Sequence, residues 1–220
     1  MNVEKFSLGY YTTEKVLPAP QMSNEKSHGY RTDPFDNSHR IVCLGDSYTY
    51  AFGSPPNHAW PSMLDTPTWN LASPGASCDR ILRIWYSVPD NLNFDTAIFL
   101  WPDAHRREWY LKDRTHAVTG TDNDEKLKVN DDTHDTFFKK HCIFLAEHLA
   151  KVYKIRTLHY LVNDNYNEKL FQKTRLTEVW HDSGIKYGPD GMHPDHSCYQ
   201  NFANIVKNDL SQLTSTNNYA

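Results

Sequence analysis

The chain has 220 residues, a length that suits a single domain with a hydrophobic core of its own. Hydrophobic residues make up 39% of it and aromatic residues 13%, a composition that excludes a disordered chain and a collagen-like repeat. Lys and Arg number 23 and Asp and Glu 27, which gives a formal net charge of -4. We therefore expect no nucleic-acid partner, because such binding depends on a basic surface.

The sequence indicates neither a membrane segment nor a secretory leader. No run approaches the roughly 18 apolar residues that a membrane helix needs. The first residues, MNVEKFSLGYYTTEKV, lack the apolar core of a signal peptide, so we predict no membrane span and a cytoplasmic location. The 4 cysteines lie far apart without a C-x-x-C pair, which predicts reduced thiols in place of a disulfide scaffold or a zinc ribbon.

The chain divides into an N-terminal arm and one domain. Residues 1–38 contain several prolines and scattered charges without sustained periodicity, which predicts an extended arm. Within residues 39–220, short apolar runs predict strands at 40–45, 68–73, 96–101, 156–162 and 176–181. Apolar residues at helical spacing predict helices at 60–64, between Gly75 and Pro89, at 131–152 and at 199–213. The charged stretch 112–132 is expected to be a long loop or a partial excursion, and the sequence says little about its shape.

This order of elements predicts an α/β fold, a three-layer α/β/α sandwich with a mainly parallel sheet of about five strands. Strands that alternate with helices form parallel sheets covered on both faces. Ligands of such sheets bind beyond the carboxyl ends of the strands. Candidate chemistry is therefore sought where the predicted strands end.

A serine follows the first predicted strand, in the sequence Gly45-Asp46-Ser47. A tight turn there would place the hydroxyl and the backbone N–H of Ser47 at the edge of the sheet, where the hydroxyl can act as a nucleophile. Alone, the turn is more typical of a helix cap, because Asp and Ser hydrogen-bond to nearby backbone. It lacks the second glycine of G-x-S-x-G, so the nucleophile elbow of α/β-hydrolases is not matched.

A carboxylate and an imidazole stand three residues apart near the end of the chain, at Asp190 and His193. A carboxylate bonded to Nδ1 of an imidazole fixes its tautomer and leaves Nε2 to take a proton from a serine hydroxyl. Asp and His are also common in turns, so this pair alone favours a structural loop. Its combination with the strand-end serine is much more specific.

Three segments together, IVCLGDSYTYAFG, NLASPGAS and DGMHPDH, resemble the motifs of the SGNH, or GDSL, hydrolase superfamily over residues 40–213. The resemblance implies the flavodoxin-like fold of these hydrolases and a serine esterase that works through an acyl-enzyme without a cofactor or a metal. It implies Ser47 as the nucleophile, His193 as general base and then acid, Asp190 as the orienting carboxylate, and the N–H groups of Ser47 and Gly75 as oxyanion donors. The expected substrate is a small-molecule or carbohydrate ester with a short acyl group such as acetyl.

The chain departs from the superfamily after the third predicted strand. The superfamily usually places an Asn there as a further oxyanion donor, whereas this chain reads FLWPDAHRRE over residues 99–108. Pro102 has no N–H, and an ionised Asp103 repels an oxyanion, so neither replaces the amide. His105 or an arginine directly after it is a candidate replacement.

Polar and aromatic residues near the predicted strand ends are candidates for substrate binding: Asp46, Tyr48, Trp101, Asp103, His105 and Arg106. Aromatic rings can line an acyl pocket, and an arginine can bind an anionic group. The composition favours a core role for at least half of the aromatic residues near these strand ends, and a solvated surface pair for Arg106 and Arg107.

Two other functions remain open. The missing Asn motivates a noncatalytic glycan-binding module on the same fold. A metal-dependent hydrolase is suggested by residues with the types and spacing of metal ligands, Asp190, His193, Asp195 and His196. A metal site would leave the Gly-Asp-Ser turn unexplained, so a catalytic triad of Ser47, His193 and Asp190 accounts for more residues.

Overall fold

The computed structural model of the chain describes residues 40–88, 94–104, 106–110, 116–119, 132–162, 176–178 and 186–216. The predicted arm, residues 1–38, lies outside these ranges, and so does His105.

A 5-stranded sheet forms the centre of the molecule, in the order β2-β1-β3-β6-β7. Its strands are β1 (Ile41–Gly45), β2 (Thr68–Asn70), β3 (Thr96–Trp101), β6 (Arg156–Leu161) and β7 (Leu176–Glu178). All neighbouring strands in it are parallel. This is the strand order of a flavodoxin-like sheet, whose direction of winding reverses between β1 and β3. The predicted fold class is confirmed, and the ends of β1 and β3 are where a ligand is expected.

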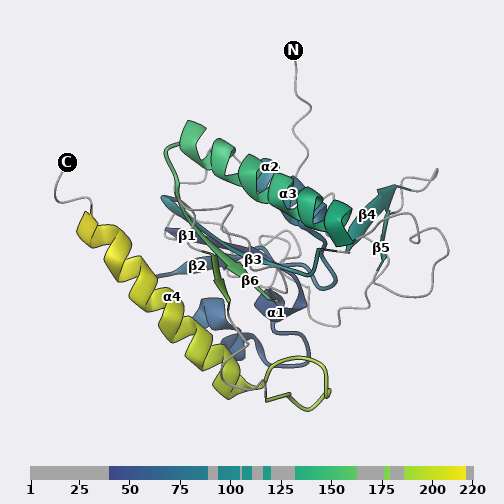
Figure 1. Cartoon of the computed structure of the whole chain (residues 1–220). Helices are drawn as coiled ribbons and strands as arrows, with labels where there is room; N and C mark the ends of the chain where they lie inside the picture. Colours follow the sequence, from purple (N-terminus) through teal and green to yellow (C-terminus); the bar gives the residue numbers. More distant parts are fainter. Residues whose placement is uncertain are drawn as a thin grey trace.

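Helices cover both faces of the sheet (Figure 1): α2 (Cys78–Tyr86) and α3 (Asp132–Val152) lie on one side, α4 (His196–Thr216) on the other. Successive side chains of β1 enter these two layers in turn, because a strand points alternate residues to opposite faces. Val42 and Leu44 pack in the core under α2 and α3, and Ile41 and Cys43 pack in the core under α4. No helix in the described part of the chain is long and apolar enough to cross a membrane.

The predicted helix at 60–64 is a short 3-10 helix, η4 (Trp60–Met63), with a proline in its first turn. Trp60 is fully buried and its ring meets that of Phe202 in α4 at a centroid distance of 4.9 Å. This contact holds the segment that follows β1 against the last helix of the chain.

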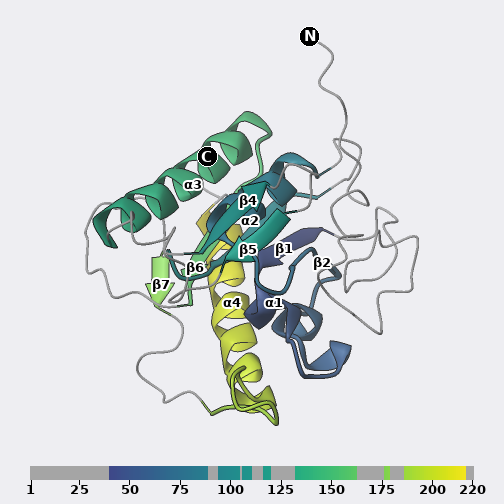
Figure 2. The ribbon, with the colours of Figure 1, turned by 90° about the vertical axis from the view of Figure 1, so that its right-hand side faces the viewer.

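β4 (Arg107–Tyr110) and β5 (His116–Thr119) form a separate antiparallel 2-stranded sheet, which lies to the right of the main sheet in Figure 1 and in front of it in Figure 2. β5 lies within the stretch 112–132, for which the sequence predicted a long loop or a partial excursion without indicating its shape. Strands of four residues carry too little periodicity to be recognised in sequence, and their pairing with each other stabilises them.

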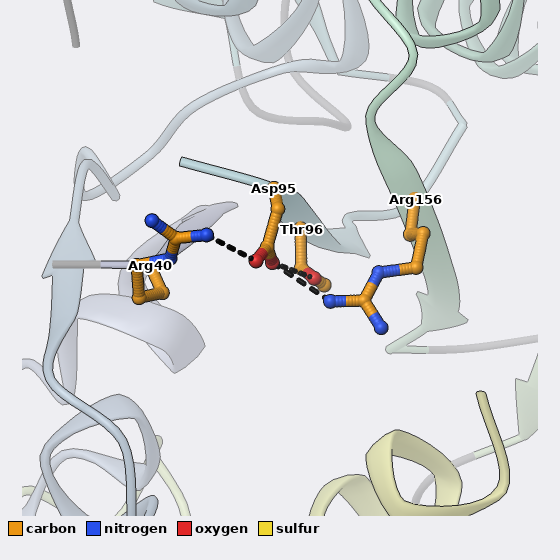
Figure 3. Close-up of polar contacts among 4 residues, drawn as sticks. All are labelled: Arg40, Asp95, Thr96 and Arg156. Carbon is orange, nitrogen blue, oxygen red and sulfur yellow. Dashed lines mark hydrogen bonds and ion pairs between the residues drawn. The ribbon is translucent and has the colours of Figure 1, made fainter. Parts of the chain in front are cut away.

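Charged residues join the amino ends of three neighbouring strands (Figure 3). Asp95, just before β3, accepts hydrogen bonds from Arg40 Nη2 at 3.0 Å, from Arg156 Nη2 at 2.8 Å and from the Thr96 hydroxyl at 2.7 Å. We call these four residues the amino-edge cluster. It lies at the edge of the sheet opposite to the one where the sequence predicts chemistry.

Candidate active site

The Gly45-Asp46-Ser47 turn connects β1 directly to a one-turn helix, α1 (Ser47–Tyr50). A side chain at position 45 would collide with Thr49 and approach the carbonyl oxygen of Leu100 to 3.1 Å, so only glycine lets α1 fold back so tightly onto β1 and β3. Ser47 is consequently the second residue beyond β1, at the carboxyl edge of the sheet, and is 7% exposed. The sequence-based placement of this serine is confirmed.

Asp46 is fully buried and both of its carboxylate oxygens are engaged. Oδ1 accepts the backbone N–H of Tyr48 at 3.0 Å and so caps α1, and Oδ2 pairs with Arg106 Nη1 at 2.6 Å. Burial raises the pKa of this carboxyl above its ordinary value, and Arg106, together with the more weakly acting His193, opposes that rise. Asp46 and Arg106, both candidates for substrate binding, therefore bind each other.

The loop before α4 orients the imidazole of His193. Asp190 Oδ1 accepts the backbone N–H groups of Met192 and His193 at 3.0 Å each, and Oδ2 lies 2.6 Å from His193 Nδ1. The backbone N–H of His193, ahead of the weaker opposing effect of burial, lowers the pKa of Asp190 to about 2. This carboxylate is therefore ionised at neutral pH and holds Nδ1 of the ring, which leaves Nε2 as the free ring nitrogen.

Contacts between rings and backbone bring this loop against the segment that carries Ser47. The His193 ring lies edge-on to Tyr48 at a centroid distance of 5.7 Å and meets the ring of Phe52 at 5.4 Å. A Cβ on Gly53 would stand 2.7 Å from Asp190 Oδ2, so this glycine, at φ 78°, makes room for the carboxylate. Residues more than 130 positions apart in sequence thus share one site.

One more ring contact and one hydrogen bond missing from the described part of the chain complete the description of this site. His58, in the short helix η3 (Pro56–His58), meets His196 at a centroid distance of 4.2 Å. Within the described residues the Ser47 hydroxyl makes no hydrogen bond, so no bond joins it to His193. Such bonds are often long in free enzymes and tighten when substrate binds.

The loop that follows β2 lies beside the serine turn. The backbone N–H groups of Leu71 and Ser73 donate to the carbonyl oxygens of Cys43 and Gly45, at 2.8 and 3.1 Å. Pairing between β2 and β1 therefore continues beyond the regular strand, up to the residues just before Gly75. Gly75 has φ 71° and no atom within 4 Å of where a Cβ would be, so it lies in an open turn at the same edge.

Two further candidates for substrate binding, Tyr48 and Asp103, also lie at this edge. Burial, and after it the charge of Asp46, raises the pKa of Tyr48 to about 12, and Asp103 adds a smaller effect in the same direction. The phenol of Tyr48 is thus a neutral O–H group at physiological pH. Asp103, at the end of β3, accepts the backbone N–H of Arg106 at 3.4 Å.

Trp101, a third candidate, lies in the core. It is fully buried, stacks on Phe99, and donates its indole N–H to His159 Nδ1 at 3.0 Å. Burial lowers the pKa of His159 to about 3, so that imidazole is neutral. Trp101 therefore packs in the core and does not join the other candidates beyond the strand ends, and the sequence carried no signal that separated it from them.

The four residues considered as metal ligands do not converge. His193 binds Asp190, His196 stacks on His58, and Asp195 Oδ1 accepts from the Ser197 hydroxyl and the Cys198 N–H. Across the described residues, no group of three His, Cys, Asp or Glu side chains is arranged to hold a metal ion.

No protein-family model matches the chain, and no curated protein sequence does. Solved structures do match. TesA has a TM-score of 0.53 at 13% identity, over 80% of this chain and 99% of its own. The psychrotrophic esterase EstA from Pseudoalteromonas sp. has a TM-score of 0.54 at 12% identity, over 82% of this chain and 100% of its own. A Bacteroides fragilis protein named as an acylhydrolase has a TM-score of 0.51 at 14% identity, over 81% of this chain and 89% of its own. This likeness confirms the α/β fold with a mainly parallel sheet that the sequence predicted.

Proposed function

We propose that the chain is a serine ester hydrolase. Ser47 is the nucleophile, His193 the general base and then the general acid, and Asp190 the carboxylate that orients His193. The backbone N–H groups of Ser47 and Gly75 donate to the oxyanion. The observation that carries this proposal is the His193 ring, bonded to Asp190 and packed on Tyr48 and Phe52 of the segment that begins with Ser47.

The reaction follows from these roles. His193 Nε2 takes the Ser47 hydroxyl proton as Oγ attacks the acyl carbon, and the carbonyl oxygen becomes an oxyanion. The C–O bond to the alcohol then breaks, the alcohol leaves with the proton from Nε2, and the acyl group stays on Oγ. A water molecule, deprotonated by the same nitrogen, attacks the acyl-enzyme, and Ser47 leaves as the protonated hydroxyl together with a carboxylic acid.

The surface beside His193 supports an ester with a short acyl group as substrate. Phe52 packs on His193 and is 41% exposed, so an apolar ring borders the base. Among the structures of the same fold, one is an esterase by its printed name. We therefore propose short acyl esters, such as acetyl esters of small alcohols or carbohydrates, as substrates.

Labelling of Ser47 tests the proposal. The structure of EstA is that of an enzyme inhibited by monoethylphosphonate, and we expect a fluorophosphonate probe to phosphonylate Ser47 here. The wild type should be labelled and should hydrolyse p-nitrophenyl acetate, and Ser47→Ala should do neither. Mass spectrometry of peptides locates the label. Labelling of another residue, or hydrolysis that survives in Ser47→Ala, would refute these roles, and a wild type inert to both reagents would favour a noncatalytic binding module.

A further inference from the structure

A buried ion pair connects the two strand ends between which the proposed reaction takes place. Asp46 follows β1, Arg106 follows β3, and these strands are neighbours at the point where the sheet reverses its winding. Asp46 Oδ2 and Arg106 Nη1 lie 2.6 Å apart; the side chain of Asp46 is 0% exposed and that of Arg106 23%. Arg106 comes from the segment in which the sequence lacks the usual amide donor.

The position of Asp46 creates an electrostatic problem for the reaction. Its carboxylate precedes the nucleophile directly and binds the N–H of Tyr48, one residue beyond Ser47. A carbonyl oxygen held by the Ser47 N–H gains negative charge as the ester is attacked. Two negative charges within several ångströms of each other repel strongly where water is excluded. A lone buried carboxylate here would therefore oppose the transition state.

We propose that Arg106 is a positioning residue that holds Asp46 as a neutral ion pair, and so lets a carboxylate cap α1 beside Ser47 without repelling the oxyanion. This inference rests on the proposed esterase function. Asp46 fixes the turn through Oδ1, and Arg106 offsets its charge through Oδ2, so the two oxygens of one carboxylate serve separate purposes.

A second substitution distinguishes charge compensation by Arg106 from a purely structural role of the ion pair, because the two predict different values of kcat. Arg106→Gln leaves the Asp46 charge unopposed, and we expect kcat to fall about a hundredfold with KM changed little, because the repulsion acts in the transition state. Adding Asp46→Asn removes the opposing charge and keeps an oxygen to accept the Tyr48 N–H. The double variant should therefore recover most of the lost kcat. If the ion pair only held the structure in place, kcat would not recover in the double variant, because that variant has no ion pair.

The experiment measures kcat and KM with p-nitrophenyl acetate and the rate of Ser47 labelling by a fluorophosphonate, in wild type, Arg106→Gln, Asp46→Asn/Arg106→Gln and Arg106→Lys. Arg106→Lys keeps the charge and should stay within about tenfold of wild type. Arg156→Gln is the matched control, because Arg156 also pairs with an aspartate but at the opposite edge, and it should leave both rates unchanged. Thermal unfolding checks that each variant is folded.

The outcomes separate this inference from the function on which it rests. A wild type that neither turns over nor is labelled refutes the esterase, and the inference falls with it. A reactive wild type with an unaffected Arg106→Gln, or with a double variant no faster than Arg106→Gln, overturns the inference alone. If Arg106→Gln does not fold, the folded double variant decides the question: a kcat within about tenfold of wild type supports compensation, and a hundredfold loss refutes it.

Discussion

The two edges of the sheet use aspartate and arginine in different surroundings. At the amino edge, the side chain of Asp95 is 39% exposed and that of its partner Arg40 is 48% exposed. At the carboxyl edge, Asp46 is 0% exposed beside an Arg106 that is 23% exposed. Exposed pairs contribute about 0–1 kcal/mol to stability, whereas removing one partner of a buried pair costs on the order of 3 kcal/mol.

The comparison teaches that the surroundings of these ion pairs, and not their presence, distinguish the candidate site. The amino-edge cluster pairs one aspartate with two arginines and with a threonine hydroxyl. The carboxyl-edge pair adjoins a serine, and an aspartate-bound imidazole lies close enough to act on the pKa of Asp46. Among the described residues, only the second edge combines a serine, an imidazole and a carboxylate bonded to that imidazole, the three groups to which we assign the proposed reaction.

The largest difference between the edges should appear in turnover. Ser47→Ala and His193→Ala are each expected to lower kcat on the order of a millionfold, and the double variant should lose little more, because both residues serve one proton transfer. Asp95→Asn at the amino edge should change kcat by less than about twofold. Steady-state kinetics with p-nitrophenyl acetate measure all four proteins. Independent, additive losses would contradict a shared proton transfer.

The lowered pKa of Asp190 sharpens the comparison next. Asp190→Asn should lower kcat about ten-thousandfold, less than the loss of Ser47, because it leaves His193 without its orienting partner. The pKa of Asp190 is about 2 in the folded chain against an ordinary value of 3.8. Its ionised form is thus favoured by folding, so its contribution to stability is complete above about pH 4 and is lost as the pH falls towards about 2.

Thermal unfolding of wild type and Asp190→Asn as a function of pH measures that contribution. The difference in Tm should be constant from about pH 7 to pH 5 and should shrink below about pH 4. A difference that stays constant down to about pH 3 would contradict the lowered pKa of Asp190.

His159 is a buried histidine to which we assign no catalytic role, so it shows the effect of burial alone on a pKa. Burial lowers the pKa of His159 to about 3 from an ordinary 6.5. Between those values the unfolded chain binds a proton that the folded chain does not, so His159 lowers stability by up to about 1.4 kcal/mol for each unit of falling pH.

Replacement of His159 by phenylalanine tests this slope. Phe keeps a ring against Phe99 but leaves the Trp101 N–H without its acceptor, a loss that does not depend on pH. Urea unfolding from about pH 7 to pH 5 should therefore show a less steep fall in stability for His159→Phe than for wild type. Parallel slopes for the two proteins would show that His159 is not kept neutral by the fold.

The smallest predicted effect concerns two glycines with positive φ at the carboxyl edge, Gly53 and Gly191. Alanine at either position costs about 1 kcal/mol of backbone strain. At position 53 the added Cβ also stands 2.7 Å from Asp190 Oδ2, whereas at position 191 no atom lies within 4 Å of it. We expect similar losses of Tm in the two variants, with the larger loss of kcat, about tenfold, in Gly53→Ala. Equal losses of kcat would show that the contact with Asp190 does not matter.

Local pattern alone was enough to predict the main elements and the pairing of two of the three proposed catalytic residues. β1, β3, α3 and α4 follow from apolar runs and helical spacing, since such periodicity directly records which residues are buried. The pairing of Asp190 with His193 is also local, because three residues of one turn close the carboxylate onto the ring. The sequence predicted the 3-10 helix η4 and the strands β4 and β5 less well, since pairing and packing with distant residues decide such short elements.

Only the tertiary structure decided which candidates meet. The sequence placed Trp101 and Arg106 alike near a strand end, but folding buries Trp101 against His159 and directs Arg106 to Asp46. It also sets His193 against Tyr48 and Phe52, across more than 130 residues of chain. Sequence periodicity reports how each segment divides its residues between core and solvent, whereas contacts between distant segments depend on the order in which the strands join the sheet.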